Sequence, residues 1–133
     1  MKMLFDVGNT RIKAAISNHG RELISLPDCG THQSEFPSTW SGIETPEAIF
    51  IASVAAEAPC ERIAAWAESS WHLKAHRVKV KQNVGGMRTA YKNPAQLGVD
   101  RWLAALGAYQ LADQQAVCVI DAGTALKIGR AHV

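Results

Sequence analysis

The sequence lacks the features that would place the chain in a membrane or on a nucleic acid. No apolar run approaches the ~18 residues that a membrane-spanning helix needs. The apolar start at residues 1–5 is interrupted by Asp6, so it cannot form the core of a secretory signal. A formal net charge of +2 is too small to indicate a nucleic acid or an anionic membrane as partner. We therefore expect a cytoplasmic protein that binds neither.

Cysteine is also scarce. The three cysteines, Cys29, Cys60 and Cys118, are far apart, and no pair has the spacing of a zinc knuckle or a redox motif. We interpret them as reduced thiols that are buried or half-buried. His72 and His76 are four residues apart, but no carboxylate or cysteine accompanies them at ligand spacing, so no metal site is expected there.

Two common phosphate-binding motifs, Gly-x4-Gly-Lys-Ser/Thr and Gly-x-Gly-x2-Gly, are missing as well. In their place the chain repeats one pattern, D-V-G-N-T at residues 6–10 and D-A-G-T at residues 121–124, each at the end of an apolar strand. Glycine lets the main chain approach an anion and present N–H groups to it, and aspartate is a ligand for Mg²⁺. One such turn is also ordinary hairpin chemistry. Two of them favour a site for a nucleotide phosphate.

The hydrophobic pattern predicts an α/β fold. Alternation and short apolar runs predict strands at residues 3–7, 11–17, 22–26, 48–54, 75–80 and 116–120. The first three strands are expected to form an antiparallel meander, and those at 48–54 and 116–120 to be buried. Helices are expected near 34–40, at 59–70 and at 97–112, with a glycine-rich loop at 83–93. Hairpins and crossovers together indicate a mixed β-sheet with flanking helices.

The segment Y-K-N-P-A-Q-L-G-V-D-R-W, residues 91–102, places Asp100 and Arg101 in the first turn of the last expected helix. A carboxylate there stabilises the helix through its dipole, which is one explanation for Asp100. The other is a general base, because phosphoryl transfer to an alcohol requires an acceptor for the hydroxyl proton. Arg101 has the planar fork that suits a substrate carboxylate. Both explanations of Asp100 stay open at this point.

Three motifs, D-V-G-N-T-R-I-K, Y-K-N-P-x-x-L-G-V-D-R-W and I-D-A-G-T-A-L, in this order and spacing, resemble those of type III pantothenate kinases. The resemblance covers nearly the whole chain. It implies an α/β, ribonuclease H-like (actin-like ATPase) domain with a mixed sheet. It also implies ATP-dependent phosphorylation of pantothenate to 4′-phosphopantothenate, the first step of coenzyme A biosynthesis. A homodimer is expected for the full-length protein.

The resemblance also implies site residues. Asp100 would be the catalytic base that activates the pantothenate hydroxyl. The residues that would contact pantothenate are Tyr91, Gly98, Val99, Asp100 and Arg101. The residues that would bind ATP are Asp6, Val7, Gly8, Asn9, Thr10, Arg11, Ile12, Lys13 and Thr124. Asp6 would lie near Mg²⁺ by way of the phosphates, and Asp121 would hold a monovalent cation, K⁺ or NH₄⁺.

Two alternatives remain: a non-catalytic regulator on the same scaffold, and an actin-like kinase that acts on another small alcohol. Asp100 favours an enzyme, because a regulator needs no base, and the motif at residues 91–101 disfavours another acceptor. We expect residues 1–115 to form an N-terminal domain and residues 116–127 to begin a second, truncated one. Residues 128–133 are expected to be a non-native tail. The isolated fragment would then have little activity.

Overall fold

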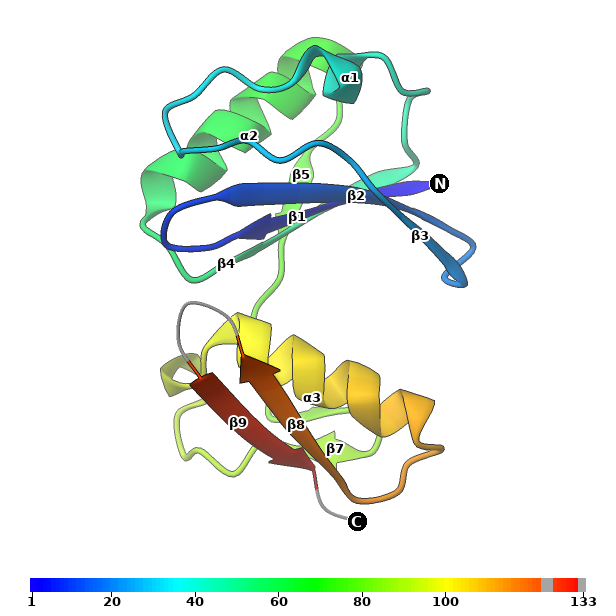
Figure 1. Ribbon diagram of the computed structural model, residues 1–133, viewed down its shortest axis with the longest axis vertical. Coiled ribbons are helices and arrows are strands. Elements are labelled where there is room, and N and C mark those ends of the chain that lie inside the picture. The colour runs from blue at the N-terminus through cyan, green and yellow to red at the C-terminus, as the bar shows by residue number, and fades with distance from the viewer. Residues whose placement is uncertain (123–125, 132–133) are drawn as a thin grey trace. The chain divides into compact units, whose positions relative to one another are not determined.

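The structure, a computed structural model, describes residues 1–122 and 126–131 of the chain. Its contacts divide the chain into two compact units, Met1–Val78 and Lys79–Val133. Each unit combines β-strands with at least one helix (Figure 1). Within the described part of the chain, no helix has both the length and the apolar character needed to cross a membrane.

The unit Met1–Val78 is built on a five-stranded sheet with the order β3-β2-β1-β4-β5. Its strands are β1 (Lys2–Val7), β2 (Ile12–Asn18), β3 (Glu22–Ser25), β4 (Ala48–Ser53) and β5 (Ala75–Arg77). The first three strands pair antiparallel, whereas β4 pairs parallel with both β1 and β5. The predicted meander and the predicted mixed α/β sheet are therefore confirmed.

Helix α2 (Glu57–Trp71) and the short helix α1 (Ser38–Ser41) lie on one face of this sheet (Figure 1). Alternate strand residues point toward that face, because successive side chains of a strand lie on opposite sides. The fully buried side chains include Met3 and Val7 of β1 and Ile63 of α2. Burial along β4 also alternates, so the expectation of a continuously buried strand at residues 48–54 was right only for Ile49 and Ile51.

An aromatic cluster fills the space between α1, α2 and the sheet. Trp40 is fully buried, and its ring meets Phe5 edge-to-face at 5.3 Å and stacks on Phe36 at 5.1 Å. Trp66 joins the cluster from α2, with its ring centroid 6.0 Å from that of Trp40. The Trp40 indole N–H donates a hydrogen bond of 2.8 Å to the carbonyl of Pro27, which satisfies the one polar group of this side chain. These residues anchor the loop between β3 and β4 to the core.

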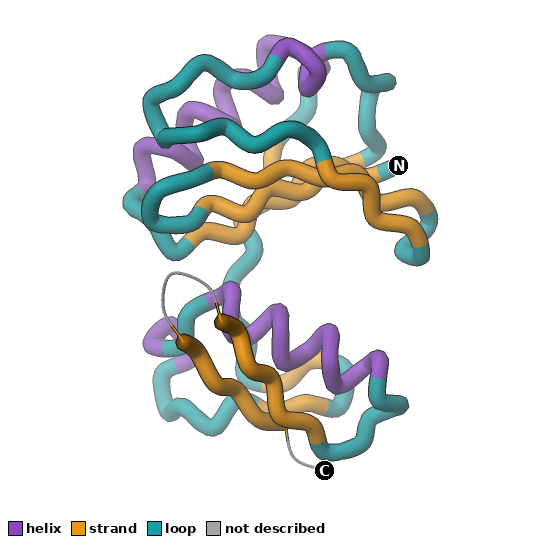
Figure 2. The backbone as a smooth tube through the Cα atoms, in the orientation of Figure 1, coloured by secondary structure: helices purple, strands orange, loops and turns teal. Residues whose placement is uncertain are grey.

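The described residues of the unit Lys79–Val133 form one long helix and two hairpins. Its elements are β6 (Asn83–Val84), β7 (Met87–Arg88), the 3₁₀ turn η1 (Pro94–Gln96), α3 (Val99–Leu111), β8 (Val117–Ala122) and β9 (Leu126–Ala131). The strands pair antiparallel as β6–β7 and β8–β9. Helix α3 packs along the β8–β9 hairpin (Figure 2) and buries Trp102, Ala105 and Tyr109. The tail predicted at residues 128–133 lies partly in β9.

Two expectations for this unit were wrong. The stretch 83–93 is not a continuous loop, because Gly85 and Gly86 take φ values of +59° and +85° and close a two-residue hairpin between β6 and β7. The strand predicted at residues 116–120 is not buried: Cys118 is exposed, and the side chain of Ile120 is 65% exposed. The reason is that, among the described residues, β8 pairs with β9 alone, with α3 on one face of the hairpin.

Candidate functional site

The first glycine turn, residues 8–11, joins β1 to β2. The N–H of Gly8 donates to the carbonyl oxygen of Arg11 at 2.9 Å and closes the turn on itself. Of the hydrogen bonds in the part of the chain that the structure describes, none is donated by the main-chain N–H of the three residues after Gly8. Asn9, Thr10 and Arg11 are all exposed. The turn can therefore present N–H groups and polar side chains to an anion.

The residues on either side of the turn place their side chains on two different faces of the sheet, one buried and one exposed. Val7 and Ile12 are fully buried, so only their main-chain atoms could take part in binding. Asp6 and Lys13 are exposed and belong to the opposite face of the sheet from the buried Phe5 and Val7. Of the predicted ATP-binding residues in this segment, the charged side chains thus remain accessible, while the apolar ones hold the strand ends in place.

The N-terminus of α3 carries the predicted acceptor site. Gly98 precedes the helix with an extended backbone, φ −60° and ψ 132°, and Asp100 lies in the first helical turn. Asp100 Oδ1 accepts a hydrogen bond of 2.8 Å from the N–H of Arg101. Val99 is buried, Asp100 is half-buried and Arg101 is exposed. The carboxylate thus satisfies a helix N–H group and is also partly accessible, so the geometry is compatible with both explanations of Asp100.

Gly98 lies close to that carboxylate. A Cβ atom added at Gly98 would stand 2.8 Å from Asp100 Oδ1, a separation that Cβ atoms essentially never show. Since its φ and ψ are accessible to every residue, the backbone does not require glycine here. A larger residue would instead force the Asp100 side chain to shift.

Tyr91 lies in the segment between β7 and η1, with 43% of its surface exposed. The start of this segment is fixed by Thr89, which is buried and donates from Oγ1 to the carbonyl of Lys81 at 2.8 Å. Gln82 adds a second link, because its Nε2 donates to the carbonyl of Thr89 at 2.7 Å. Thr89 and Gln82 were not among the residues that the sequence pointed to.

The second glycine turn is described only in part. Asp121 is exposed near the end of β8, opposite Lys127 in the hairpin register. Thr124, the remaining predicted ATP-binding residue, lies outside the described residues, as does Gly123. Across residues 1–122 and 126–131, no three His, Cys, Asp or Glu side chains are grouped as a metal site. The first turn belongs to one compact unit, and the acceptor motif and Asp121 belong to the other.

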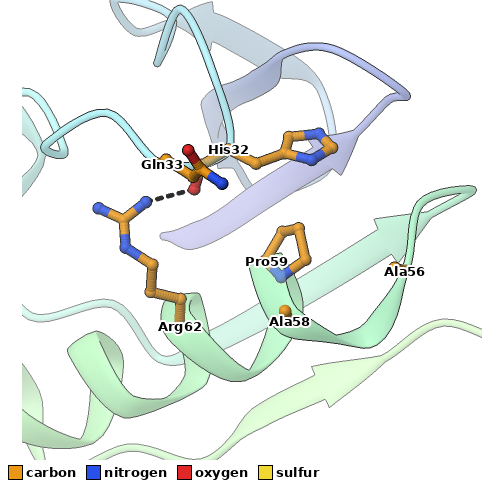
Figure 3. A pocket seen from close by; sticks show the side chains of 6 residues that line it. All are labelled: His32, Gln33, Ala56, Ala58, Pro59 and Arg62. Carbon is orange, nitrogen blue, oxygen red and sulfur yellow. Dashed lines mark hydrogen bonds between the residues drawn. The ribbon is translucent and has the colours of Figure 1, made fainter.

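A pocket of about 490 Å³ opens between α2 and the loop that follows β3 (Figure 3). Its lining residues are His32, Gln33, Ala56, Ala58, Pro59 and Arg62. The Nε2 atom of His32 lies 2.7 Å from the carbonyl oxygen of Gly8, so this loop contacts the first glycine turn. Sequence reasoning missed His32 and Arg62, because these contacts join residues 24 to 30 positions apart and follow no local pattern.

Comparisons with known proteins all point to one family. A sequence model of the family "Type III pantothenate kinase" matches residues 2–130. A protein of that name from Burkholderia mallei is 32% identical over 126 residues, which are 94% of this chain and 48% of the relative. Another, from Nitrosococcus oceani, is 27% identical over 136 residues, covering 96% of this chain and 51% of the relative. The chain therefore spans about half the length of the curated relatives it matches.

Proposed function

Because the chain belongs to the type III pantothenate kinase family, we propose that it serves the ATP-dependent phosphorylation of pantothenate to 4′-phosphopantothenate in coenzyme A biosynthesis. The observation that carries this proposal is the family match over residues 2–130, which spans all three motifs. The geometry of the first turn and of the α3 N-terminus supports it, because each offers the groups that one half of the reaction needs.

The turn at residues 8–11 is proposed to bind the ATP phosphates. Its exposed N–H groups and the side chains of Asn9, Thr10 and Lys13 supply donors and positive charge. Among the described residues, a Cβ at Gly8 would meet only the carbonyl of Arg11 at 3.6 Å, an ordinary contact, so this part of the fold tolerates a larger residue there. Close approach of a phosphate to the main chain is a reason for glycine that fits this observation. Asp6 is the residue proposed to hold Mg²⁺, which would neutralise phosphate charge.

The N-terminus of α3 is proposed to bind and activate pantothenate. Asp100 would accept the proton of the primary hydroxyl as that oxygen attacks the γ-phosphorus atom of ATP. The bond from that phosphorus to the β,γ-bridging oxygen breaks, and ADP leaves. Arg101 would pair with the pantothenate carboxylate, and Tyr91, Gly98 and Val99 would complete the contacts. We further propose Asp121 as the ligand of a monovalent cation, K⁺ or NH₄⁺, and Thr124 as an ATP contact.

The finer classification is also a proposal. A meander followed by parallel strands, with helices on one face, supports assigning the first unit to the ribonuclease H-like, actin-like fold. Domain limits at residues 115 and 127, a non-native tail at 128–133, a homodimer and a cytoplasmic location all remain predictions. The relatives from Burkholderia mallei and Nitrosococcus oceani are about twice as long as this chain, and these predictions concern a full-length protein of that kind.

Replacing Asp100 by Asn tests the proposal. In a full-length protein containing this chain, Asp100→Asn should lower the turnover of pantothenate by about 10²–10⁴-fold, because the proton acceptor is lost. ATP binding, measured by calorimetry, should be retained. The matched control is Asp113→Asn, an exposed aspartate that follows the other end of α3 with φ +50°, a conformation that Asn tolerates. Full activity in Asp100→Asn would remove Asp100 from the mechanism, and absence of pantothenate phosphorylation in the unsubstituted protein would favour the regulator.

A further inference from the structure

We infer that His32 is a positioning residue for the phosphate-binding turn, an inference that rests on the proposed function. The half-buried imidazole of His32 places Nε2 2.7 Å from the carbonyl oxygen of Gly8. A carbonyl oxygen only accepts, so Nε2 carries the proton and donates. His32 comes from the loop between β3 and α1, 24 residues after Gly8, and it is therefore a tertiary link rather than part of the turn.

This link sets the direction of the peptide between Gly8 and Asn9. A trans peptide is planar, and its C=O and N–H point in opposite directions. With the carbonyl of Gly8 held by His32, the N–H of Asn9 must point away from His32, toward the side where it has no acceptor among the described residues. The N–H of Gly8 is already bonded to Arg11. His32 thus fixes the orientation of the first N–H group that the turn offers to an anion.

His32 is itself held in place by Arg62 of α2. The Arg62 guanidinium donates through Nη1 to the carbonyl of His32 and through Nη2 to the carbonyl of Ser34, the latter at 2.6 Å. It also lies over the ring of Phe36, 4.2 Å from its centroid. In Figure 3 the imidazole of His32 points away from Arg62, so the main chain is held on one side and the ring is directed to the other. The loop is thereby fastened to the helix.

A second link ties the same loop to the strand that leaves the turn. The N–H of Cys29 donates to the carbonyl of Ile12 at 2.9 Å, and the N–H of Ile12 donates back at 3.2 Å. Ile12 is the first residue of β2, so the loop contacts the chain both before and after the turn. Such bracing reduces the conformational entropy that the turn would lose when it binds phosphate. The bracing also explains why a histidine with no expected chemistry stands beside the turn.

The test compares three variants of the chain by amide hydrogen exchange in NMR and by titration with MgATP. His32→Leu removes the donor, and His32→Gln keeps an N–H donor at similar reach. His76→Leu is the control, since His76 is exposed on β5. We expect His32→Leu to speed exchange at Gly8, whose N–H closes the turn on Arg11, and to weaken MgATP binding by about fivefold to tenfold, the effect of one hydrogen bond. His32→Gln should restore most of both, and His76→Leu should change neither. In a full-length protein, the KM for ATP should rise while the KM for pantothenate stays unchanged.

The inference is overturned if His32→Leu leaves both exchange at Gly8 and MgATP affinity unchanged. It is also overturned if His32→Gln is as impaired as His32→Leu, because the donor would then not matter. If His32→Leu does not fold, His32→Asn, which is polar but too short to reach Gly8, replaces it with the same expected results. If the unsubstituted chain does not bind MgATP, the titration is repeated in a full-length protein that contains it, and absence of binding there contradicts the proposed function. Exchange at Gly8 still decides whether His32 orients the turn.

Discussion

Asp6 and Lys13 lie directly opposite each other across the antiparallel pair of β1 and β2, one residue pair before the strands end at the glycine turn. Both side chains are exposed, and directly opposed residues project from the same face of a sheet. A carboxylate and an ammonium group therefore stand together at the base of the turn. Opposite charges in this arrangement stabilise a strand pair only modestly. The placement fits one group for Mg²⁺ and one for a phosphate oxygen.

Lys13→Met should weaken MgATP binding by about tenfold or more, because a hydrogen bond to a charged group contributes about 1.5–3 kcal/mol. The loss should be larger at low ionic strength, since salt screens exposed charges. Calorimetric titration at two salt concentrations measures both effects. Lys2→Met is the matched control: Lys2 is exposed on the neighbouring strand β1, where it pairs with Ser17 at the far end from the turn. Equal affinities in the two variants would exclude Lys13 from phosphate binding.

Gly8→Ala should weaken MgATP binding with little effect on the stability of the fold. The added methyl group would make one ordinary contact of 3.6 Å with the carbonyl of Arg11, so we expect the free energy of unfolding to change by less than about 1 kcal/mol. MgATP affinity should fall at least about tenfold, because the methyl group occupies the approach of a phosphate to the main chain. Gly42→Ala is the control, since its Cβ would also meet a main-chain oxygen, that of Thr39, at 3.6 Å. Unchanged affinity in Gly8→Ala would contradict a phosphate at this turn.

Much of the first unit could be predicted from hydrophobic periodicity. The meander and α2 follow local patterns of alternating or helically spaced apolar residues, and the structure has them close to the expected limits. Burial of the strand at residues 116–120 could not be predicted in the same way. Its continuous apolar run is typical of a strand covered on both faces, but exposure depends on what packs against it, and in the part of the chain that the structure describes β8 pairs with β9 alone. The β6–β7 hairpin did carry a local signal, the Gly-Gly pair, but glycine pairs also occur in irregular loops.

In the candidate site, too, some residues could be predicted from local sequence patterns and others could not. Residues that belong to short motifs and are proposed to act in the site, such as Asp6 and Asp100, stand out because glycine turns and helix starts have local signatures. His32 and Arg62 do not, because their contacts with the turn and its supporting loop arise only when distant segments pack together. The sequence therefore pointed to groups proposed to touch substrate and missed the groups that hold them in place.

Gly98→Ala should disturb the Asp100 carboxylate with little effect on folding. Because the new Cβ would lie 2.8 Å from Oδ1 of Asp100, that carboxylate must move. In a full-length protein we expect kcat for pantothenate phosphorylation to fall by about tenfold or more, since small displacements of a catalytic group are costly. The KM for ATP should stay the same. Gly107→Ala in the same helix is the control: apart from the adjoining backbone of α3, no heavy atom of the described residues lies within 4 Å of its Cβ position, and it should stabilise α3 by about 1 kcal/mol. Normal kcat in Gly98→Ala would argue against a precise role for Asp100.

The contact between the amino group of Met1 and Glu47 should make the stability of the fold depend on pH in acid. The amino group of Met1 donates a hydrogen bond of 2.7 Å to Glu47 Oε1, and this bond, together with the positive charge of that group, lowers the pKa of Glu47 below its ordinary value of 4.5. The folded state therefore holds this proton less tightly than the unfolded state does. The stabilisation is fully present above pH 4.5 and is lost as the pH falls through the lowered pKa of the folded state.

Urea unfolding of the unsubstituted chain and of Glu47→Gln, followed from about pH 6 down to about pH 3, measures this contribution. The unsubstituted chain should be the more stable at the upper end, and the difference should shrink as the solution becomes more acidic. The effect should be small and weaker in high salt, because the carboxylate is exposed. Acetylation of the N-terminus removes the positive charge and should abolish the difference at every pH. A stability difference that does not depend on pH would show that the contact between Met1 and Glu47 contributes no charge interaction to folding.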